Sequence, residues 1–337
     1  MTYGLRRSGI GVLAGIDIDA TCRETYESNN VGSRFIHADI TNLSFDEVAK
    51  ITGITDNDDK LIFVGCSPCQ YWSLLKSDKT RSKKTAYLLD HFQEFVAHFN
   101  PGYVVVENVP GILRKKKSPL GSFNKFLEAH GYRYRCEGVV NANDYGVAQN
   151  RHRFLLIASR VAPVFPPKPI RGRKPVLRDI LGEKNGFRRI PAGTIDPSSR
   201  LHSASALSSK NLERIRLTPK NGGTRQAWRD DESLQLAAYR GKDDAFSDVY
   251  GRMFWDKPSP TITTRFISLS NGRFGHPDED RAISVREGAC LQSFPKTYKI
   301  KIEGLQSAAR IIGNAVPPLM SKAIGKTILE SFNGRTD

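Results

Sequence analysis

Short apolar runs alternate with amphipathic segments along the first half of the chain. The runs are rich in β-branched and aromatic residues, each leads into a polar turn, and they occupy residues 12–19, 61–66, 103–109 and 153–159. Between them, apolar residues recur at helical spacing at residues 21–29, 44–51 and 88–99. Strands that alternate with helices predict an α/β fold with a parallel sheet covered on both faces. Ligands of such sheets bind outside the carboxyl ends of the strands.

After residue 160 the pattern becomes irregular, beginning with a stretch rich in proline and cations. Regular patterning returns at Pro258. Beyond it, Ser284 and Glu287 have the spacing of a capping box, and a last amphipathic helix is expected from about Pro318. We therefore expect a first domain at residues 1–160, a smaller, irregular domain at 161–257, and a remainder at 258–337 whose last helix returns to the first domain.

The charge balance indicates the kind of partner. The 337 residues include 51 Lys+Arg and 35 Asp+Glu, a formal net charge of +16, and roughly half of this surplus falls between residues 161 and 257. Such a surplus favours a polyanionic partner, and nucleic acid is the first candidate. The five cysteines form an odd set without the spacing of a disulfide framework, which suggests a reducing compartment. No window approaches the roughly 18 apolar residues of a membrane span, so we expect a soluble protein.

Cys66 and Cys69 stand three positions apart at the end of an apolar run, and this spacing allows three interpretations. A structural zinc site needs four ligands, and the sequence offers no second Cys-x-x-Cys or His-x-x-x-His pair, so no metal is expected. A thioredoxin-like pair begins a helix, whereas here Pro68 precedes Cys69 and a long polar loop follows. The remaining interpretation makes Cys69 a nucleophile in a loop after a buried strand.

A nucleophile needs companions, and two other expected strands can supply them. Glu107 ends one run, at what would be the same edge of the sheet as Cys69. Gln149, Arg151 and Arg153 occupy alternate positions, so an extended chain would project all three to one side. Each residue taken alone has an ordinary structural explanation, as a solvated strand end, an exposed strand face or a small buried hydrophobe. Together they predict a thiol, a carboxylate and guanidinium groups converging on one cleft.

Five short motifs, in order, resemble those of bacterial DNA (cytosine-5)-methyltransferases, and the match runs almost from end to end. They are SPCQ at 67–70, ENV at 107–109, QNRHR at 149–153, SVREGACLQSFP at 284–295 and GNAVPP at 313–318. The resemblance implies a Rossmann-like S-adenosylmethionine-dependent methyltransferase fold, with residues 161–257 as a target-recognition domain that reads DNA. It also implies the activity of a site-specific DNA (cytosine-5)-methyltransferase of a restriction-modification system.

The chemistry explains why the family needs these residue types. Carbon 5 of cytosine is too weak a nucleophile to take a methyl group directly from a sulfonium donor. Addition of the Cys69 thiolate at carbon 6 makes carbon 5 enamine-like, and loss of the carbon-5 proton after methyl transfer expels the thiolate. By resemblance, Glu107 hydrogen-bonds ring N3 and the amino group, and Arg153 contacts the base carbonyl. Arg151 would lie near the cysteine, and both cations would lower the pKa of its thiol.

The cytosine must leave the duplex stack to reach such a pocket, so the resemblance implies base flipping. The stretch from Tyr71 to Ala86 is interpreted as a loop that closes over the flipped DNA with its cations on phosphates, a merely solvated loop being the alternative. Cys66 is interpreted as a bystander. The residues expected to contact DNA or the target base are Gln70, Ser73, Asn108, Gln149, Arg225, Arg265 and Arg273.

The contacts of the methyl donor are also implied by the resemblance. Asp17 would hold the ribose hydroxyls, with Ile18 against adenine, and Asp39 would accept from the adenine amino group beside Ile40. Pro68, Leu88, Asn314 and Val316 complete the expected shell. Double-stranded DNA is the expected partner, a cognate restriction endonuclease a further one, and the protein is expected to act as a monomer in the bacterial cytoplasm, at the nucleoid.

One family feature is absent from the sequence. The family opens with a strand and a Phe-x-Gly-x-Gly-Gly loop, which, counted back from Asp17, would end immediately before Met1. An upstream start, a second polypeptide that supplies the strand, and a catalytically impaired, DNA-binding remnant each explain this departure. An RNA cytosine-5 methyltransferase is a weaker alternative, because the Cys-Phe-Thr segment and the small insert of those enzymes are not found here.

We predict that the 337-residue chain is poorly stable or binds S-adenosylmethionine weakly. Loss of a central strand from a parallel sheet leaves unpaired backbone and an exposed apolar face, and each costs on the order of several kcal/mol if nothing compensates. Isothermal titration calorimetry of the chain with S-adenosylmethionine measures the affinity. A micromolar dissociation constant would contradict the prediction.

Overall fold

The computed structural model describes residues 1–66, 88–114, 118–197, 199–236, 238 and 247–334, which form two compact units. Unit 1 comprises Met1–Tyr145, His152–Pro169 and Met320–Asp337, and unit 2 comprises Gly146–Arg151 and Ile170–Leu319. Residues 146–151 therefore group with unit 2, although the segments on both sides belong to unit 1. The functional division expected at residues 160 and 257 stays a prediction.

Unit 1 holds every named strand and most of the long helices. Its strands are β1 (Ala14–Asp17), β2 (Arg34–His37), β3 (Ile62–Gly65), β4 (Tyr103–Asn108), β5 (Tyr134–Asn141) and β6 (His152–Ser159). Its helices are α1 (Thr2–Arg6), α2 (Arg23–Asn29), α3 (Phe45–Thr52), α5 (Leu88–Phe99), α6 (Leu120–Ala129) and the greater part of α10 (Pro318–Asn333). The start of α10 confirms the helix expected from Pro318.

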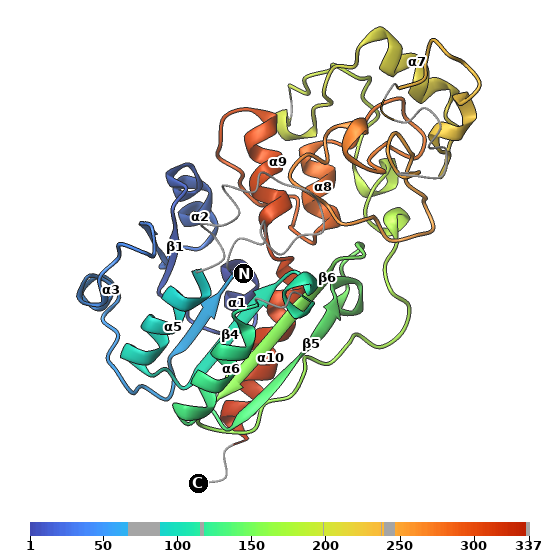
Figure 1. Ribbon diagram of the computed structural model, residues 1–337. Helices are drawn as coiled ribbons and strands as arrows, with labels where there is room; N and C mark the ends of the chain where they lie inside the picture. Colours follow the sequence, from blue (N-terminus) through green and yellow to red (C-terminus); the bar gives the residue numbers. More distant parts are fainter. Residues whose placement is uncertain (67–87, 115–117, 198, 237, 239–246, 335–337) are drawn as a thin grey trace. The chain divides into compact units, whose positions relative to one another are not determined.

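The strands form two sheets (Figure 1). β1 pairs in parallel with β2, and the second sheet has the order β3-β4-β6-β5. β3 and β4 are parallel, whereas β6 runs antiparallel to both β4 and β5. The expectation of a parallel sheet is therefore wrong for β5 and β6. Parallel neighbours need a crossover of a dozen or more residues, usually a helix, and the segment 142–151 that joins these strands contains no such helix.

Four strand edges lack a partner strand among the described residues, one each on β1, β2, β3 and β5. β1 pairs through one edge with β2, and β3 pairs through one edge with β4. Leu13, Ile16 and Ile18, in or beside β1, are 48%, 39% and 65% exposed.

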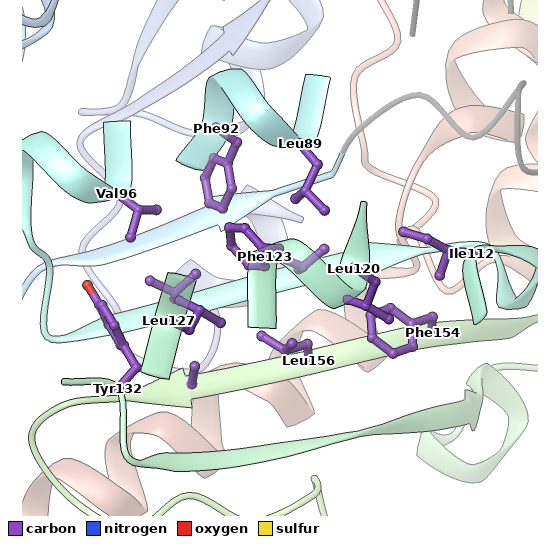
Figure 2. Close-up of a cluster of buried hydrophobic side chains, with 13 residues drawn as sticks. Leu89, Phe92, Val96, Ile112, Leu120, Phe123, Leu127, Tyr132, Phe154 and Leu156 are labelled. Atoms are coloured by element: carbon purple, nitrogen blue, oxygen red, sulfur yellow. The ribbon is translucent and has the colours of Figure 1, made fainter. Parts of the chain in front are cut away.

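Helices cover both faces of the four-stranded sheet, as expected, with α5 and α6 on one face and α10 on the other (Figure 1). Alternate residues of β4 supply the two faces. Val104 and Val106 join a buried cluster with side chains of β6, α5 and α6, among them Phe154, Phe92 and Leu127 (Figure 2). On the other face the Tyr103 hydroxyl lies 3.2 Å from the hydroxyl of Ser331 in α10. β4 is therefore buried along its whole length.

Unit 2 has little regular structure. Its helices are α7 (Ser209–Leu217), α8 (Val285–Leu291) and α9 (Leu305–Asn314). The predicted capping box begins α8, because the Ser284 hydroxyl accepts from the Glu287 N–H and the Glu287 carboxylate accepts from the Ser284 N–H. The Arg252 side chain, 1% exposed, donates to four backbone carbonyls and one carboxylate, those of Ile215, Thr218, His276, Glu279 and Asp280.

None of the helices in the described part of the chain is both long and apolar enough to cross a membrane.

Replacing Leu127 with alanine should lower the free energy of unfolding by about 2–5 kcal/mol. Leu127 is 0% exposed in the cluster between the sheet and α6, so the truncation leaves a cavity as well as losing apolar burial. Leu113→Ala is the matched control, because Leu113 is 48% exposed and should change the same quantity by only about 0.5 kcal/mol. Urea denaturation measures both, and equal effects would contradict the proposed core.

Candidate active site

Glu107 and Arg153 form an ion pair at one edge of the four-stranded sheet. The Arg153 Nε lies 3.0 Å from Glu107 Oε1, and the two side chains are only 12% and 7% exposed. The Arg153 Nη1 also donates to the carbonyl of His152 at 2.7 Å. Among the described residues, Glu107 Oε2 and Arg153 Nη2 have no hydrogen-bond partner. One acceptor and one donor of the pair are thus available to a ligand.

The antiparallel register creates this pair. Glu107 is the second-last residue of β4, Arg153 is the second residue of β6, and Asn108 stands opposite Phe154. The next residue, Asn108, is 2% exposed, and its Oδ1 accepts the N–H of Val109, which turns the chain away from the sheet. The amide of Asn108 therefore supports the strand end, and its predicted contact with DNA stays a prediction.

Cys66 follows β3 directly and is exposed. Gly65 pairs with Val106 in the parallel register of β3 and β4, so the chain leaves β3 beside the strand end that carries Glu107. The predicted nucleophile Cys69 and the predicted contacts Pro68, Gln70 and Ser73 lie outside the described residues, as does the whole stretch from Tyr71 to Ala86. Burial raises the pKa of the Cys136 thiol and raises that of Cys290 to about 11, so both are poor nucleophiles at neutral pH.

Two carboxylates stand at the ends of the neighbouring parallel strands β1 and β2. Asp17 Oδ1 accepts the N–H of Asp19 at 2.8 Å, and Asp39 Oδ1 accepts the N–H and the hydroxyl of Thr41 at 3.0 and 2.9 Å. The bonds from Thr41 lower the pKa of Asp39, which keeps it anionic. Among the described residues, the Oδ2 of each accepts no hydrogen bond. The next residues, Ile18 and Ile40, are respectively 65% exposed and half-buried, and Leu88 begins α5 half-buried.

The QNRHR motif is divided between the two units. Arg153 belongs to unit 1, whereas Gln149 and Arg151, 0% and 3% exposed, belong to unit 2. The Arg151 guanidinium donates to the carbonyls of Ile262, Gly313 and Ala315 at 3.0 to 3.1 Å. Arg153 thus lies against Glu107, the described contacts of Arg151 are with backbone carbonyls, and the convergence of the motif's side chains on one cleft stays a prediction. Of the two predicted donor contacts in unit 2, Asn314 is exposed and Val316 is buried.

The comparisons with known proteins agree with these motifs. The family model described as "C-5 cytosine-specific DNA methylase" matches residues 1–330. The chain belongs to this family. Type II methylase M.HgiDII of Herpetosiphon aurantiacus is 36% identical over 342 residues, covering 99% of this chain and 93% of that protein. Type II methyltransferase M1.BsuMI of Bacillus subtilis is 32% identical over 276 residues, which cover 80% of this chain and 61% of the relative.

Solved structures establish the fold. A crystal structure described as a prophage-encoded DNA modification methyltransferase of E. coli superposes with a TM-score of 0.69 at 21% identity, covering 98% of this chain and 96% of that one. DNMT2 of Spodoptera frugiperda gives 0.63 at 14% identity, over 97% and 96% of the two chains. The fold is the Rossmann-like methyltransferase fold expected from the sequence.

The three arginines expected to contact DNA differ in their surroundings within this methylase. Arg225 is 6% exposed in a short turn of unit 2. Arg273 donates to the Asp248 carboxylate and to the carbonyls of Gly222 and Arg252. Arg265 is exposed, and its side chain makes no hydrogen bond or ion pair within the described part of the chain. The structure therefore leaves Arg265 available to a ligand, whereas the described contacts of Arg273 are internal to unit 2.

Glu287 of the SVREGACLQSFP motif belongs to a buried ionic network of this methylase that sequence reasoning missed. Arg281, 0% exposed, donates to both carboxylate oxygens of Glu287 at 2.7 and 2.9 Å and to those of Glu279. His276, Glu279 and Glu287 lie close enough to hold a metal ion. However, Arg281 occupies both carboxylates, and His276 Nδ1 accepts the N–H groups of Asp278 and Glu279. These contacts favour a structural ion pair over a metal site.

Glu287→Gln should remove a pH-dependent part of the stability of this methylase. Burial by itself raises the pKa of Glu287, but Arg281 outweighs it and holds the value at about 2, below the ordinary 4.5. The stabilisation is therefore present above pH 4.5 and lost as the pH falls towards 2, a change of about 3 kcal/mol. Urea denaturation should show that the difference in unfolding free energy between variant and wild type becomes smaller as the pH is lowered from 7 to 2.5.

An exposed glutamate, Glu128, supplies the control for this measurement. Glu128→Gln should leave the pH dependence of the unfolding free energy unchanged. A constant difference between Glu287→Gln and wild type across the whole pH range would show that the Glu287 carboxylate is not held ionised by Arg281.

Proposed function

We propose that the chain is a site-specific DNA (cytosine-5)-methyltransferase that transfers the methyl group of S-adenosylmethionine to carbon 5 of a flipped cytosine in duplex DNA, through a covalent bond to Cys69. The observation that carries this proposal is the ion pair of Glu107 with Arg153, at the strand edge where the segment leading to Cys69 leaves β3. Membership of the cytosine-specific methylase family supports it.

Cys69 supplies the covalent step. Its thiolate attacks carbon 6 of the cytosine, and the C5–C6 π electrons become available at carbon 5. Carbon 5 takes the methyl group as the bond between methyl and the donor sulfur breaks, which leaves S-adenosylhomocysteine. A base then removes the carbon-5 proton, and the returning electron pair re-forms the double bond and expels the thiolate. Cys69 is regenerated and the cytosine carries one methyl group in place of one hydrogen. Cys136 and Cys290 cannot take this role, because burial raises their pKa values.

Glu107 and Arg153 prepare the ring for the attack. The free Oε2 of Glu107 accepts from the amino group or from protonated N3, which stabilises the charge that develops when the thiolate adds. The Nη2 of Arg153 donates to the base carbonyl, while its Nε holds the Glu107 carboxylate in place at 3.0 Å. A rigid, largely buried pair at a strand end presents both groups without reorganisation during the reaction.

The carboxylates of Asp17 and Asp39 are suited to bind the methyl donor, S-adenosylmethionine. When bound, S-adenosylmethionine supplies an electrophilic methyl group on sulfur. The unoccupied Oδ2 atoms of Asp17 and Asp39 offer two acceptors, the first for ribose hydroxyls and the second for the adenine amino group. The anionic state of Asp39 suits an acceptor. Ile18 and Ile40 offer apolar contacts to adenine, and Leu88, Asn314, Val316 and Pro68 complete the proposed shell.

Duplex DNA is the proposed substrate, and unit 2 is proposed to read its sequence. The net charge of +16 favours phosphate contact, and the exposed side chain of Arg265 is available to make one. The relatives are Type II methylases, so we propose a restriction-modification role with a cognate endonuclease. The protein would act as a monomer at the nucleoid in the bacterial cytoplasm.

Two alternatives make different predictions. A catalytically impaired remnant would bind duplex DNA without transferring methyl groups. An RNA cytosine-5 methyltransferase would use transfer RNA in preference to DNA. Assays with tritiated S-adenosylmethionine on mixed-sequence duplex DNA and on transfer RNA separate all three functions.

Duplex DNA with 5-fluorocytosine at modified sites should trap the protein in a denaturant-resistant adduct, because fluorine at carbon 5 cannot leave as a proton does and the thiolate is not expelled. Cys69→Ser should abolish both the adduct and methyl transfer, and Cys66→Ser, its matched control, should retain them. Glu107→Gln should lower kcat by about a hundredfold or more. Adduct formation by Cys69→Ser, or its loss in Cys66→Ser alone, would overturn the assigned nucleophile.

A further inference from the structure

Both backbone polar groups of Ile262 are bound by side chains of one short segment. Gln149 Oε1 accepts the Ile262 N–H at 3.0 Å, and Arg151 Nη1 donates to the Ile262 carbonyl at 3.0 Å. Gln149 and Arg151 are alternate residues, so an extended chain presents both to the same neighbour. Ile262 is 0% exposed, and so is Gln149. Hydrogen bonds buried to this extent hold one arrangement, because water cannot replace them.

The same guanidinium closes the end of α9. Arg151 Nη2 donates to the carbonyl of Gly313 at 3.0 Å and to that of Ala315 at 3.1 Å. These two carbonyls stand on either side of Asn314, at a helix end where the last carbonyls lack partners within the helix and where the helix dipole favours a cation. Arg151 therefore fixes the backbone before and after Asn314, whose own side chain is exposed.

Gly313 allows the end of α9 to approach this closely. A Cβ at position 313 would lie 2.4 Å from the carbonyl carbon and oxygen of Thr263, the residue after Ile262. The Gln292 side chain of the SVREGACLQSFP motif donates to the carbonyl of Ile312. Three of the five motifs thus meet at the carboxyl end of α9, through contacts to its backbone.

We infer that Arg151 is a positioning residue, which sets the turn at Asn314 for binding of the methyl donor, and that it does not touch the target base. The guanidinium already donates to three buried carbonyls, so a contact with the base would require breaking these bonds. The inference rests on the proposed function, in which Asn314 and Val316 belong to the donor shell. It separates Arg151 from Arg153, which stands two residues later and pairs with the catalytic carboxylate.

Steady-state kinetics of Arg151→Met test this assignment. We expect the KM for S-adenosylmethionine to rise by about tenfold or more while kcat stays within about threefold, because the donor is bound less well and the reacting groups are unchanged. Arg310→Met is the matched control, because Arg310 is an exposed arginine of α9, the helix whose end Arg151 contacts, and it should change neither KM nor kcat. Arg151→Lys should give an intermediate KM, since one ammonium nitrogen replaces only part of the forked contact.

A loss of kcat of about a hundredfold with unchanged KM for the donor would assign Arg151 to the chemical step and overturn the inference. Hydrogen exchange tests it independently of activity. Arg151→Met, or Arg151→Lys if the first variant does not fold, should speed exchange in the segment 313–316 by about tenfold, and Arg310→Met should not. Unchanged exchange there would also overturn the inference. If the wild-type protein transfers no methyl groups, the proposed function fails, and the exchange experiment still decides the role of Arg151.

Discussion

The antiparallel pairing of β6 with β4 is the constraint on which the candidate active site depends. It brings the first residues of β6 to the last residues of β4, so that Arg153 reaches Glu107 at 3.0 Å. A parallel β6 would carry Arg153 to the opposite edge, beside Tyr103. Glu107 would then be a buried carboxylate without a cation, at a cost of several kcal/mol, of order 3–5 by analogy with broken buried pairs. The acid and the cation of the site therefore also stabilise the strand ends that present them.

Arginines hold together the unit that has little regular structure. Five arginines are buried among the described residues, and all of them, Arg151, Arg214, Arg225, Arg252 and Arg281, lie in unit 2. Irregular backbone leaves carbonyls without ladder or helix partners, and a guanidinium offers five donors in a fixed fork. Arg252 alone donates to four carbonyls. Part of the positive charge of this unit therefore serves its folding, and the surface available to DNA is less basic than the sequence count suggests.

The sequence predicted the strands that are strongly apolar and missed the others. The runs that contain β1, β3, β4 and β6 stood out because burial on the sheet requires continuous apolar residues. β2 has only four residues, and β5 alternates exposed and half-buried positions at the edge of the sheet, so neither shows a clear apolar run. The direction of β6 was also missed, because an apolar run has the same pattern in either direction.

Contacts between two side chains of the candidate site could be predicted from the sequence, whereas contacts between a side chain and the backbone could not. Glu107 and Arg153 were expected to lie together and do so, although the parallel sheet predicted from the sequence would have placed them at opposite edges. Arg151 could not be assigned to backbone carbonyls, because a carbonyl acceptor is present at every residue and leaves no mark in the sequence. The same holds for Arg273, which donates to Asp248 and to three carbonyls, while its expected contact with DNA stays a prediction. The only sequence feature that pointed to the network around Arg281 was the capping box that ends in Glu287.

The alternate spacing of Gln149, Arg151 and Arg153 in QNRHR matches the contacts that these side chains make within the two units. Gln149 and Arg151 bind Ile262 within unit 2, and Arg153 binds Glu107 within unit 1. In an extended chain, alternate residues face the same way, and insertion of one residue turns every later side chain to the other face. A single insertion after Arg151 would keep the contacts of Ile262 and remove Arg153 from Glu107. The motif therefore supplies Gln149 and Arg151 to buried backbone contacts of unit 2 and Arg153 to the ion pair of unit 1, so its alternate spacing serves two sets of contacts.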